Sequence, residues 1–272
     1  MNIKKFSEIN QQDLSLVGGK GLSLGLLTRN GFNVPDGFVI TTQVFDSYYQ
    51  KDLPSSVDGE ILDHFDLLKT EKVAVRSSAI GEDSKDSSWA GLFVSYLNVG
   101  REDLVQRVRD CWRSIESEKI NSYSSNLAQR DKPQLAVVVQ KMVQAQVSGV
   151  MFTKNPVTQK DEILIESTYG LGELLVQGQI TPDSFLVNHK MEILARNIEF
   201  KDKMLSPNNY DNREIEVPED LKNVPSLSDK NILDLAMLGK KIEQFYGYPQ
   251  DIEFSIEKDQ IYILQSRPIT TL

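Results

Sequence analysis

Apolar residues fall along the chain in patterns that predict a mixture of strands and helices. A continuous β-branched run at residues 135–140 is typical of a central strand of a sheet. Helical spacing predicts two long helices, at residues 104–124 and 229–246, the second capped by Ser228 and ended by Gly247. Shorter strands are predicted at residues 38–40, 73–75, 92–99, 147–152 and 163–166. Residues 201–228 are polar and poorly periodic, which favours a loop or excursion.

The most distinctive alternation of polar and apolar residues comes near the end of the chain. Because side chains alternate across a sheet, we expect two triplets to lie each on one face: Asp251, Glu253 and Ser255, and Ile263, Gln265 and Arg267. A carboxylate and an amide oxygen would then lie beside a guanidinium. Such a set suits Mg²⁺ and the polyphosphate that accompanies it. A half-buried hairpin with a solvated polar face is the alternative.

Composition narrows the class of protein. The 272 residues suffice for one large domain or two modest lobes, and the net charge of −9 argues against general nucleic-acid or membrane-surface binding. The single cysteine, Cys111, excludes an internal disulfide and favours a reducing compartment. Neither a signal peptide nor a membrane span is predicted, so we expect a cytoplasmic protein.

Two motifs in the first half have the chemistry of phosphate binding. Residues 17–21 (VGGKG) place three glycines around Lys20 before a helical pattern, where main-chain N–H groups and a lysine can meet an anion. A tight turn with an exposed lysine is the alternative. Arg76 and two serines follow the strand at residues 73–75 and should lie at its carboxyl end. The long polar stretch after them is typical of a mobile phosphate-covering loop, or of a solvated surface loop.

Further polar residues come at the ends of predicted strands in the middle of the chain. Gln140 ends one strand, and the main chain at Met142 and Val143 could offer N–H and C=O groups to a planar base. Met142 could equally be core filler. Glu166 ends another strand beside a glycine-rich turn, where it could bind a ribose hydroxyl or cap a helix.

Taken in order, these motifs resemble the ATP-binding domain of the phosphoenolpyruvate synthase and pyruvate phosphate dikinase family, which rifampin phosphotransferases share. The resemblance runs from about residue 17 to residue 270. It is carried by VGGKG, VPDGFVIT, VAVRSSA with GEDS and SWAGLF, VVVQKMV, SGVMFT, YGLGE with VQGQITPD, and PQDIEFS with YILQSRPIT. It implies an α+β ATP-grasp fold with a nucleotide cleft between two lobes, here residues 1–139 and 140–272.

The resemblance also implies a role for each matching residue. Lys20, Arg76 and Arg267 would bind the ATP phosphates, and residues 81–91 would form a loop over the β- and γ-phosphates. Gln140 and the main chain of Met142 and Val143 would meet the adenine, and Glu166 would lie near the ribose. Mg²⁺ would be ligated by Glu253 and Gln265.

The family resemblance implies a Mg²⁺-ATP-dependent phosphotransferase that passes the β-phosphate to a histidine and releases AMP and phosphate. The family's histidine motif does not occur here, because His64 and His189 lack its setting. We therefore expect the acceptor to be a histidine domain or protein outside these residues, or a small molecule. An arginine-rich stretch of the family is also missing at residues 118–124. A self-sufficient ATP-grasp kinase or ligase, and a non-catalytic nucleotide-sensing module, are the alternatives.

Overall fold

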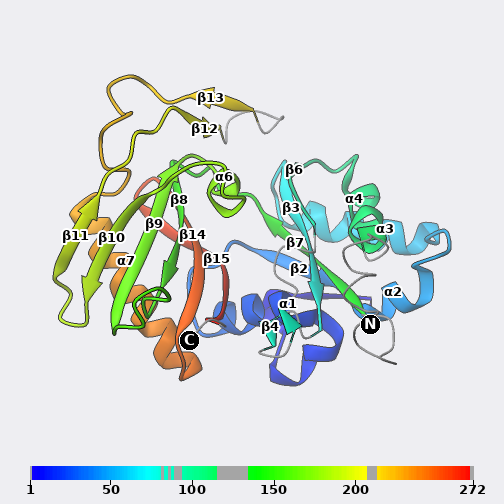
Figure 1. Ribbon diagram of the computed structural model, residues 1–272. Helices are drawn as coiled ribbons and strands as arrows, with labels where there is room; N and C mark the ends of the chain where they lie inside the picture. The colour runs from blue at the N-terminus through cyan, green and yellow to red at the C-terminus, as the bar shows by residue number, and fades with distance from the viewer. Residues whose placement is uncertain are drawn as a thin grey trace. The chain divides into compact units, whose positions relative to one another are not determined.

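The computed structural model describes residues 2–80, 83–84, 87–88, 94–114, 134–206 and 213–269. The chain divides into two compact units, Met1–Met142 and Val143–Leu272, and each contains its own sheet (Figure 1). Helices and strands occur in both, so the predicted α+β class is confirmed. The division falls three residues after the predicted one, because strand β7 (Leu135–Lys141) belongs entirely to the first sheet. None of the helices in the described ranges is long and apolar enough to cross a membrane.

The sheet of the first unit has the strand order β1-β2-β7-β3-β6, with the predicted β-branched strand β7 at its centre. Its strands are β1 (Ile3–Lys5), β2 (Gly37–Ile40), β3 (Val73–Ala79), β6 (Ser95–Val99) and β7. Its helices are η1 (Phe6–Glu8), η2 (Gln11–Asp13), α1 (Leu14–Arg29), α2 (Thr42–Tyr48), α3 (Ser55–Leu67) and α4 (Leu104–Arg113). A separate short hairpin pairs β4 (Asp83–Ser84) with β5 (Ser87–Ser88).

Helices cover both faces of this first sheet. Buried side chains of α2, α3 and α4 pack with Val73, Val75 and Val137 in the larger core. On the other face, η1 and α1 pack against Val39, Ala136 and Val138. This division follows from the alternation of side chains along β7, which sends odd-numbered residues to the larger core and even-numbered residues toward α1.

The sheet of the second unit has the strand order β11-β10-β9-β8-β14-β15, and all of its neighbouring strands are antiparallel. Its strands are β8 (Val147–Phe152), β9 (Glu162–Tyr169), β10 (Asp183–Asn188), β11 (Ile193–Asn197), β14 (Gln250–Glu257) and β15 (Gln260–Pro268). A short helix, α6 (Glu173–Val176), follows β9. The predicted excursion at residues 201–228 contains a two-stranded hairpin of β12 (Lys203–Leu205) and β13 (Glu214–Glu216).

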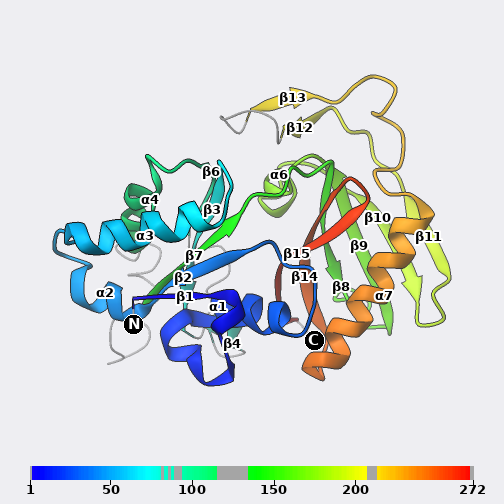
Figure 2. The same ribbon diagram turned by 180° about the vertical axis from the view of Figure 1, so that it is seen from behind.

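One face of this second sheet is largely apolar and covered by α7 (Asp229–Tyr246), which Figure 2 shows in orange along the sheet. The predicted caps of α7 are confirmed, because the Ser228 hydroxyl accepts a hydrogen bond from Asn231 N–H and Gly247 adopts a left-handed conformation. The buried residues of this face line up across the strands: Ile252, Met151, Ile165 and Phe185. Residues of opposite parity along the same strands carry the polar side chains of the opposite face.

Candidate functional site

The glycine turn at Val17–Gly21 interrupts helix α1 and starts it again. Gly18 has φ +69° and ψ 177°, so α1 consists of two helical stretches joined by a kink at this residue. The second stretch therefore begins at Gly19 and Lys20 and runs to Arg29. Because the first N–H groups of a helix have no partner within it, this start can bind an anion. Lys20 lies in this first turn, as the sequence indicated.

The side chain of Ser78 holds this turn against strand β3. Its hydroxyl donates to the Val17 carbonyl at 2.8 Å and accepts from Gly21 N–H at 3.1 Å. Ser78 is completely buried. A Cβ on Gly18 would lie 2.4 Å from both the carbonyl oxygen and the hydroxyl oxygen of Ser78, which leaves room only for glycine. The turn and β3 are thus fitted to each other at atomic contact.

Arg76 lies on the same face of the first sheet as Ser78. The predicted strand end is wrong here, because β3 continues through Arg76 to Ala79 rather than ending at Val75. Arg76 and Ser78 stand opposite Val138 and Ala136 of β7, which pack toward α1. Residues directly opposite in an antiparallel pair point to the same face. Arg76 therefore projects from mid-strand on the side where the glycine turn lies.

Gln140 belongs to this same face, since it stands opposite Ala74 of β3 and Gly37 of β2. The residue is 1% exposed, and its side-chain Nε2 has no hydrogen-bond partner among the described residues. A buried amide without a partner is costly in a folded protein and often marks a ligand position. Nearby, the Met142 N–H donates to the Lys72 carbonyl at 3.2 Å, whereas Val143 is buried at the start of the second unit. A planar nucleotide base could donate a hydrogen bond to the Met142 carbonyl without breaking the bond from Met142 N–H to Lys72.

The second unit brings the predicted acidic and amide side chains into one row across its sheet. Glu166, Val150, Glu253 and Gln265 stand directly opposite one another on β9, β8, β14 and β15. All four point to the face opposite α7. Glu166 was expected at the end of a strand, but β9 continues to Tyr169, so Glu166 lies within the sheet. We call Glu166, Glu253 and Gln265 the acid–amide row.

One residue predicted for this face lies on the other one. Ile263 was expected beside Gln265 and Arg267, but the register of β14 and β15 shifts between Glu253 and Phe254. Glu253 stands opposite Gln265, and Phe254 stands opposite Ile263, so Leu264 is an extra residue in β15. A bulge of this kind breaks strict alternation. Ile263 is consequently completely buried on the α7 side.

Asp251 and Arg267 form an ion pair next to the acid–amide row. Two nitrogen atoms of the Arg267 guanidinium, Nε and a terminal nitrogen, each lie 2.8 Å from Asp251 Oδ2. Burial nevertheless raises the pKa of Asp251, with Glu253 adding to the rise and Arg267 opposing it. Asp251 was not among the predicted site residues, although its alternation with Glu253 placed it on the same face.

Glu166 shares this electrostatic environment. Burial raises its pKa above the ordinary value, and the charge of Asp251 adds to the rise. None of the described residues donates a hydrogen bond to its carboxylate. The charge of Asp251 thus acts on Glu166, the charge of Glu253 acts on Asp251, and the Arg267 guanidinium opposes the effect at Asp251. Such a face is stabilised by an additional cation.

The donor set on this face fits Mg²⁺. Glu253 offers carboxylate oxygens and Gln265 an amide carbonyl oxygen, and protein sites for Mg²⁺ commonly supply one or two carboxylates while phosphates and waters complete the coordination. Within the described ranges, no group of three or more His, Cys, Asp or Glu residues is arranged to hold a metal by itself. A metal here would thus need ligands from a bound molecule such as a polyphosphate.

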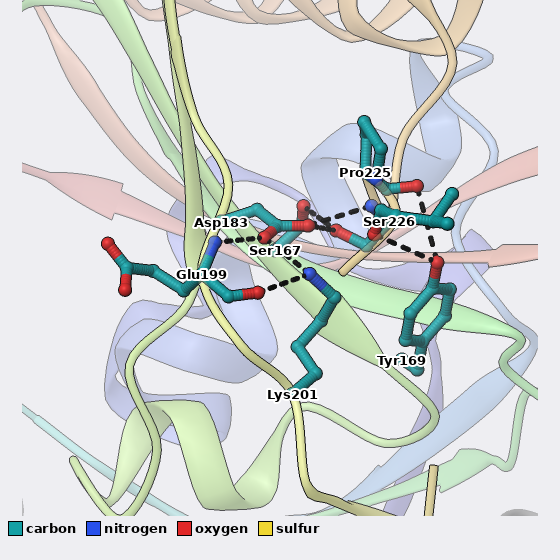
Figure 3. Close-up of polar contacts among 8 residues, drawn as sticks. Ser167, Tyr169, Asp183, Glu199, Lys201, Pro225 and Ser226 are labelled. Atoms are coloured by element: carbon teal, nitrogen blue, oxygen red, sulfur yellow. Dashed lines mark hydrogen bonds and ion pairs between the residues drawn. The ribbon is translucent and has the colours of Figure 1, made fainter. Parts of the chain in front are cut away.

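A second polar cluster, which sequence reasoning missed, lies around Asp183 on the other face of the same sheet (Figure 3). The fully buried Asp183 carboxylate accepts from Lys201 Nζ at 2.7 Å and from Glu199 N–H at 3.0 Å through Oδ1. Through Oδ2 it accepts from the N–H and the hydroxyl of Ser226, both at 2.7 Å. Lys201 also donates to the Glu199 carbonyl. We call Asp183, Lys201 and Ser226 the buried anchor.

The buried anchor fixes both ends of the excursion that carries hairpin β12–β13. Ser226 gives its only hydroxyl proton to Asp183, so in its 2.7 Å contact with Ser167 the Ser167 hydroxyl is the donor. The Tyr169 hydroxyl donates to the carbonyls of Val224 and Pro225. Within the hairpin, the Leu205 carbonyl accepts from Leu171 N–H. The only local indication of this cluster is that Asp183 follows a proline at the start of a strand.

Two sequence predictions fall mainly outside the described residues. Of the expected phosphate-covering loop at residues 81–91, only the short strands β4 and β5 are described. The altered arginine-rich stretch at residues 118–124 lies outside them, as does the part of the helix predicted beyond Ser114.

Most of the chain matches a known protein family. The sequence profile of a family described as pyruvate phosphate dikinase, AMP/ATP-binding domain, matches residues 14–53 and 49–272. The chain belongs to this family. The resemblance drawn from the motifs is thereby confirmed over almost the whole chain.

The relatives are longer proteins. The chain is 37% identical to an uncharacterized phosphotransferase, YvkC, of Bacillus subtilis, covering 96% of this chain and 34% of the relative. It is 36% identical to a probable phosphoenolpyruvate synthase of Methanothermobacter thermautotrophicus, covering 98% and 46%. With the phosphoenolpyruvate synthase of Pyrococcus furiosus the identity is 33%, covering 99% and 44%. The chain thus spans between a third and just under half of the length of these relatives.

Among solved structures, the D-alanine–D-alanine ligase from Helicobacter pylori matches with a TM-score of 0.45 and 14% identity, covering 95% of this chain and 56% of that one. PH1788 from Pyrococcus horikoshii matches with a TM-score of 0.43 and 14% identity, covering 97% of each chain.

Proposed function

We propose that this chain binds Mg²⁺-ATP and catalyses the nucleotide half-reaction of a phosphotransferase. In this reaction the β-phosphate of ATP ends on a histidine of a separate domain or chain, and AMP and phosphate are released. The relatives' printed names, phosphotransferase and phosphoenolpyruvate synthase, support this class of reaction. Because the chain covers only part of those relatives, the acceptor is proposed to lie outside the residues present here.

Residues of the first unit are proposed to bind the phosphates and the base. Lys20 and Arg76 would neutralise phosphate charge, and the restarted helix at Gly19 would offer main-chain N–H groups. The buried Gln140 amide without a partner would meet the adenine, together with main-chain groups of Met142 and Val143. The Gln140 side-chain nitrogen would then gain a hydrogen bond that none of the described residues provides.

Residues of the second unit are proposed to bind the metal and complete the charge balance. Glu253 and Gln265 would ligate Mg²⁺, which when bound neutralises phosphate charge and aligns the reacting groups. Arg267, oriented by Asp251, would bind a phosphate oxygen, and Glu166 would accept a hydrogen bond from a ribose hydroxyl. Lys20, Arg76 and Arg267 would thus act in catalysis through electrostatic stabilisation.

One observation supports this proposal more strongly than the others do. In a chain of the AMP/ATP-binding family, the interrupted helix with Lys20 is fastened by Ser78 to the strand and face that carry Arg76. The properties of a polyphosphate site are present together here: a glycine at the kink, the start of a helix, a lysine and an arginine. A tight turn formed for stability alone would not need either cation.

Product analysis tests the reaction. The chain is incubated with Mg²⁺ and ATP carrying ³²P at the β-position, with and without a histidine-domain protein from a relative. We expect AMP as the nucleotide product, with label on the added protein in an acid-labile form. Replacing the acceptor histidine of that protein by alanine is the control and should abolish labelling.

The same assay distinguishes the second candidate function. ADP formed with a small-molecule acceptor, and no label on protein, would indicate a self-sufficient ATP-grasp kinase or ligase instead. Nucleotide binding without turnover under either condition would favour a sensing module. A failure to bind any nucleotide would overturn the proposal.

A further inference from the structure

Ser78 makes two hydrogen bonds on the two sides of the kink in α1. It donates to the carbonyl of Val17, the residue before the kink, and accepts from the N–H of Gly21, in the first turn after it. A hydroxyl is the smallest side-chain group that can donate and accept at the same time. Ser78 therefore satisfies two main-chain groups that the interruption of the helix leaves without helical partners.

The contact leaves little freedom for the turn. At Gly18 the Ser78 carbonyl and hydroxyl occupy the space that a side chain would need, and the φ of +69° is strained for other residues. Close packing of this kind transmits small displacements, because the atoms have no void to relax into. A change at Ser78 should therefore move the start of the second helical stretch.

The register of β3 connects this contact to Arg76. Arg76 and Ser78 are two residues apart on one strand and point to the same face. On the other side of the contact, Lys20 precedes Gly21, whose N–H is bound to Ser78. One hydroxyl thus joins the main chain that carries Lys20 to the strand that carries Arg76.

We infer that Ser78 is a positioning residue for polyphosphate binding, which fixes the start of the helix and Lys20 relative to Arg76. The inference rests on the proposed function, since it assigns no chemistry to Ser78 itself. Removing the hydroxyl should weaken binding of the phosphates, whereas recognition of the nucleoside should be preserved. A purely structural role would instead lower stability and leave the preference for phosphates intact.

The neighbouring Ser77 supplies a matched control. Ser77 is also buried, and its hydroxyl also donates to a main-chain carbonyl, that of Val94, at 3.2 Å. It points to the opposite face, among the residues that pack on α2 to α4. Ser77→Ala and Ser78→Ala therefore each remove one buried hydroxyl from the same strand, and only Ser78→Ala acts on the glycine turn.

The experiment measures dissociation constants for Mg²⁺-ATP and adenosine by calorimetry, using displacement titrations for the weaker ligand, in wild type and both variants. We expect Ser78→Ala to weaken ATP binding about 10- to 100-fold, the range expected from small misplacements of binding groups. Adenosine affinity should change less than about 3-fold, and Ser77→Ala should keep the ratio of the two constants found in the wild type. An unchanged ratio in Ser78→Ala would overturn the inference.

Hydrogen exchange gives a second readout that needs no variant. In the wild-type chain the Gly21 amide should exchange slowly, because it is bound to a buried hydroxyl, and ATP should slow it further. Rapid exchange of Gly21 in the folded protein would overturn the inference even if Ser78→Ala failed to fold. If wild-type protein bound neither ATP nor adenosine, the proposed function would fail first, and the protection of Gly21 would still report on the contact.

Discussion

Asp183 and Glu166 lie on neighbouring strands, β10 and β9, but their carboxylates point to opposite faces of one sheet. Asp183 accepts four hydrogen bonds, one of them from a buried ammonium group. Glu166 accepts none from the described residues, and its pKa is raised. The buried acid with donors on all sides holds the fold together, whereas the acid without donors has capacity for a ligand.

The first and largest expected effect comes from breaking the buried anchor. Lys201→Met should lower the free energy of unfolding by about 3–5 kcal/mol, because it leaves the Asp183 charge buried without its ion partner. Urea unfolding followed by circular dichroism measures the change. Lys230→Met is the control, since Lys230 pairs with Asp234 at the surface, where solvent screens the pair and its contribution to stability is small. Equal effects of the two substitutions would contradict the distinction between anchor and surface pairs.

An intermediate effect is expected at the pair beside the acid–amide row. Arg267→Met should lower the free energy of unfolding by about 1–3 kcal/mol, because the Asp251 side chain is largely buried while the arginine that pairs with it is partly exposed. Arg196→Met removes a similar pair with the exposed Asp229 and serves as the control. The same urea titration applies. If Arg267→Met lowered the free energy of unfolding as much as Lys201→Met, Asp251 and Arg267 would be a structural pair like Asp183 and Lys201, which would contradict the comparison.

Smaller effects are expected from the hydroxyls of the anchor. Ser226→Ala removes one of two donors to Asp183 Oδ2. It should lower the free energy of unfolding by only about 1 kcal/mol, because the main-chain N–H still donates to the same oxygen. Ser167→Ala should cost less, because its hydroxyl contacts only Ser226 among the described side chains. In a double-mutant cycle we expect the combined cost to fall short of the sum. Strict additivity would show that the two hydroxyls act independently.

Glu166→Gln should have the smallest effect, and in the opposite direction. Because the folded state raises the pKa of Glu166, wild-type protein loses stability as the pH rises through that pKa, and the glutamine variant does not. The variant should therefore be the more stable protein at pH 8, with a difference that vanishes below the ordinary pKa of a glutamate. Thermal unfolding from pH 4 to pH 8 measures this, with Glu162→Gln on the same strand as the control. A variant less stable than wild type at pH 8 would contradict the account.

The strands and the polar face of the second sheet could be predicted from the sequence. The alternation of Asp251 and Glu253 with apolar neighbours placed both on one face, and Gln265 stands opposite Glu253 as that reasoning requires. Helix α7 was predicted with its ends and caps. Local patterns of this kind depend on residues close in the chain, which a sequence shows directly.

Features that depend on contacts between distant residues could not be predicted. The bulge at Leu264 places Ile263 on the opposite face of the sheet from the one expected, and the local sequence does not predict this bulge. Lys201 lies in a region with no periodicity, and its partner Asp183 is found only when the excursion folds back. Likewise, the bond from Gly21 to Ser78 joins residues that are 57 positions apart. Which residues bind nucleotide remains a prediction that rests on these placements.

The central claim, that the polar residues on these sheets bind Mg²⁺-ATP, is tested most directly by calorimetric titration of ATP into the chain with and without Mg²⁺. The account predicts saturable binding of one ATP per chain that depends on Mg²⁺. It also predicts that Arg76→Ala and Glu253→Gln each weaken binding at least about tenfold, whereas the surface variant Arg113→Ala does not. Absence of binding, or equal affinity in all four proteins, would contradict it.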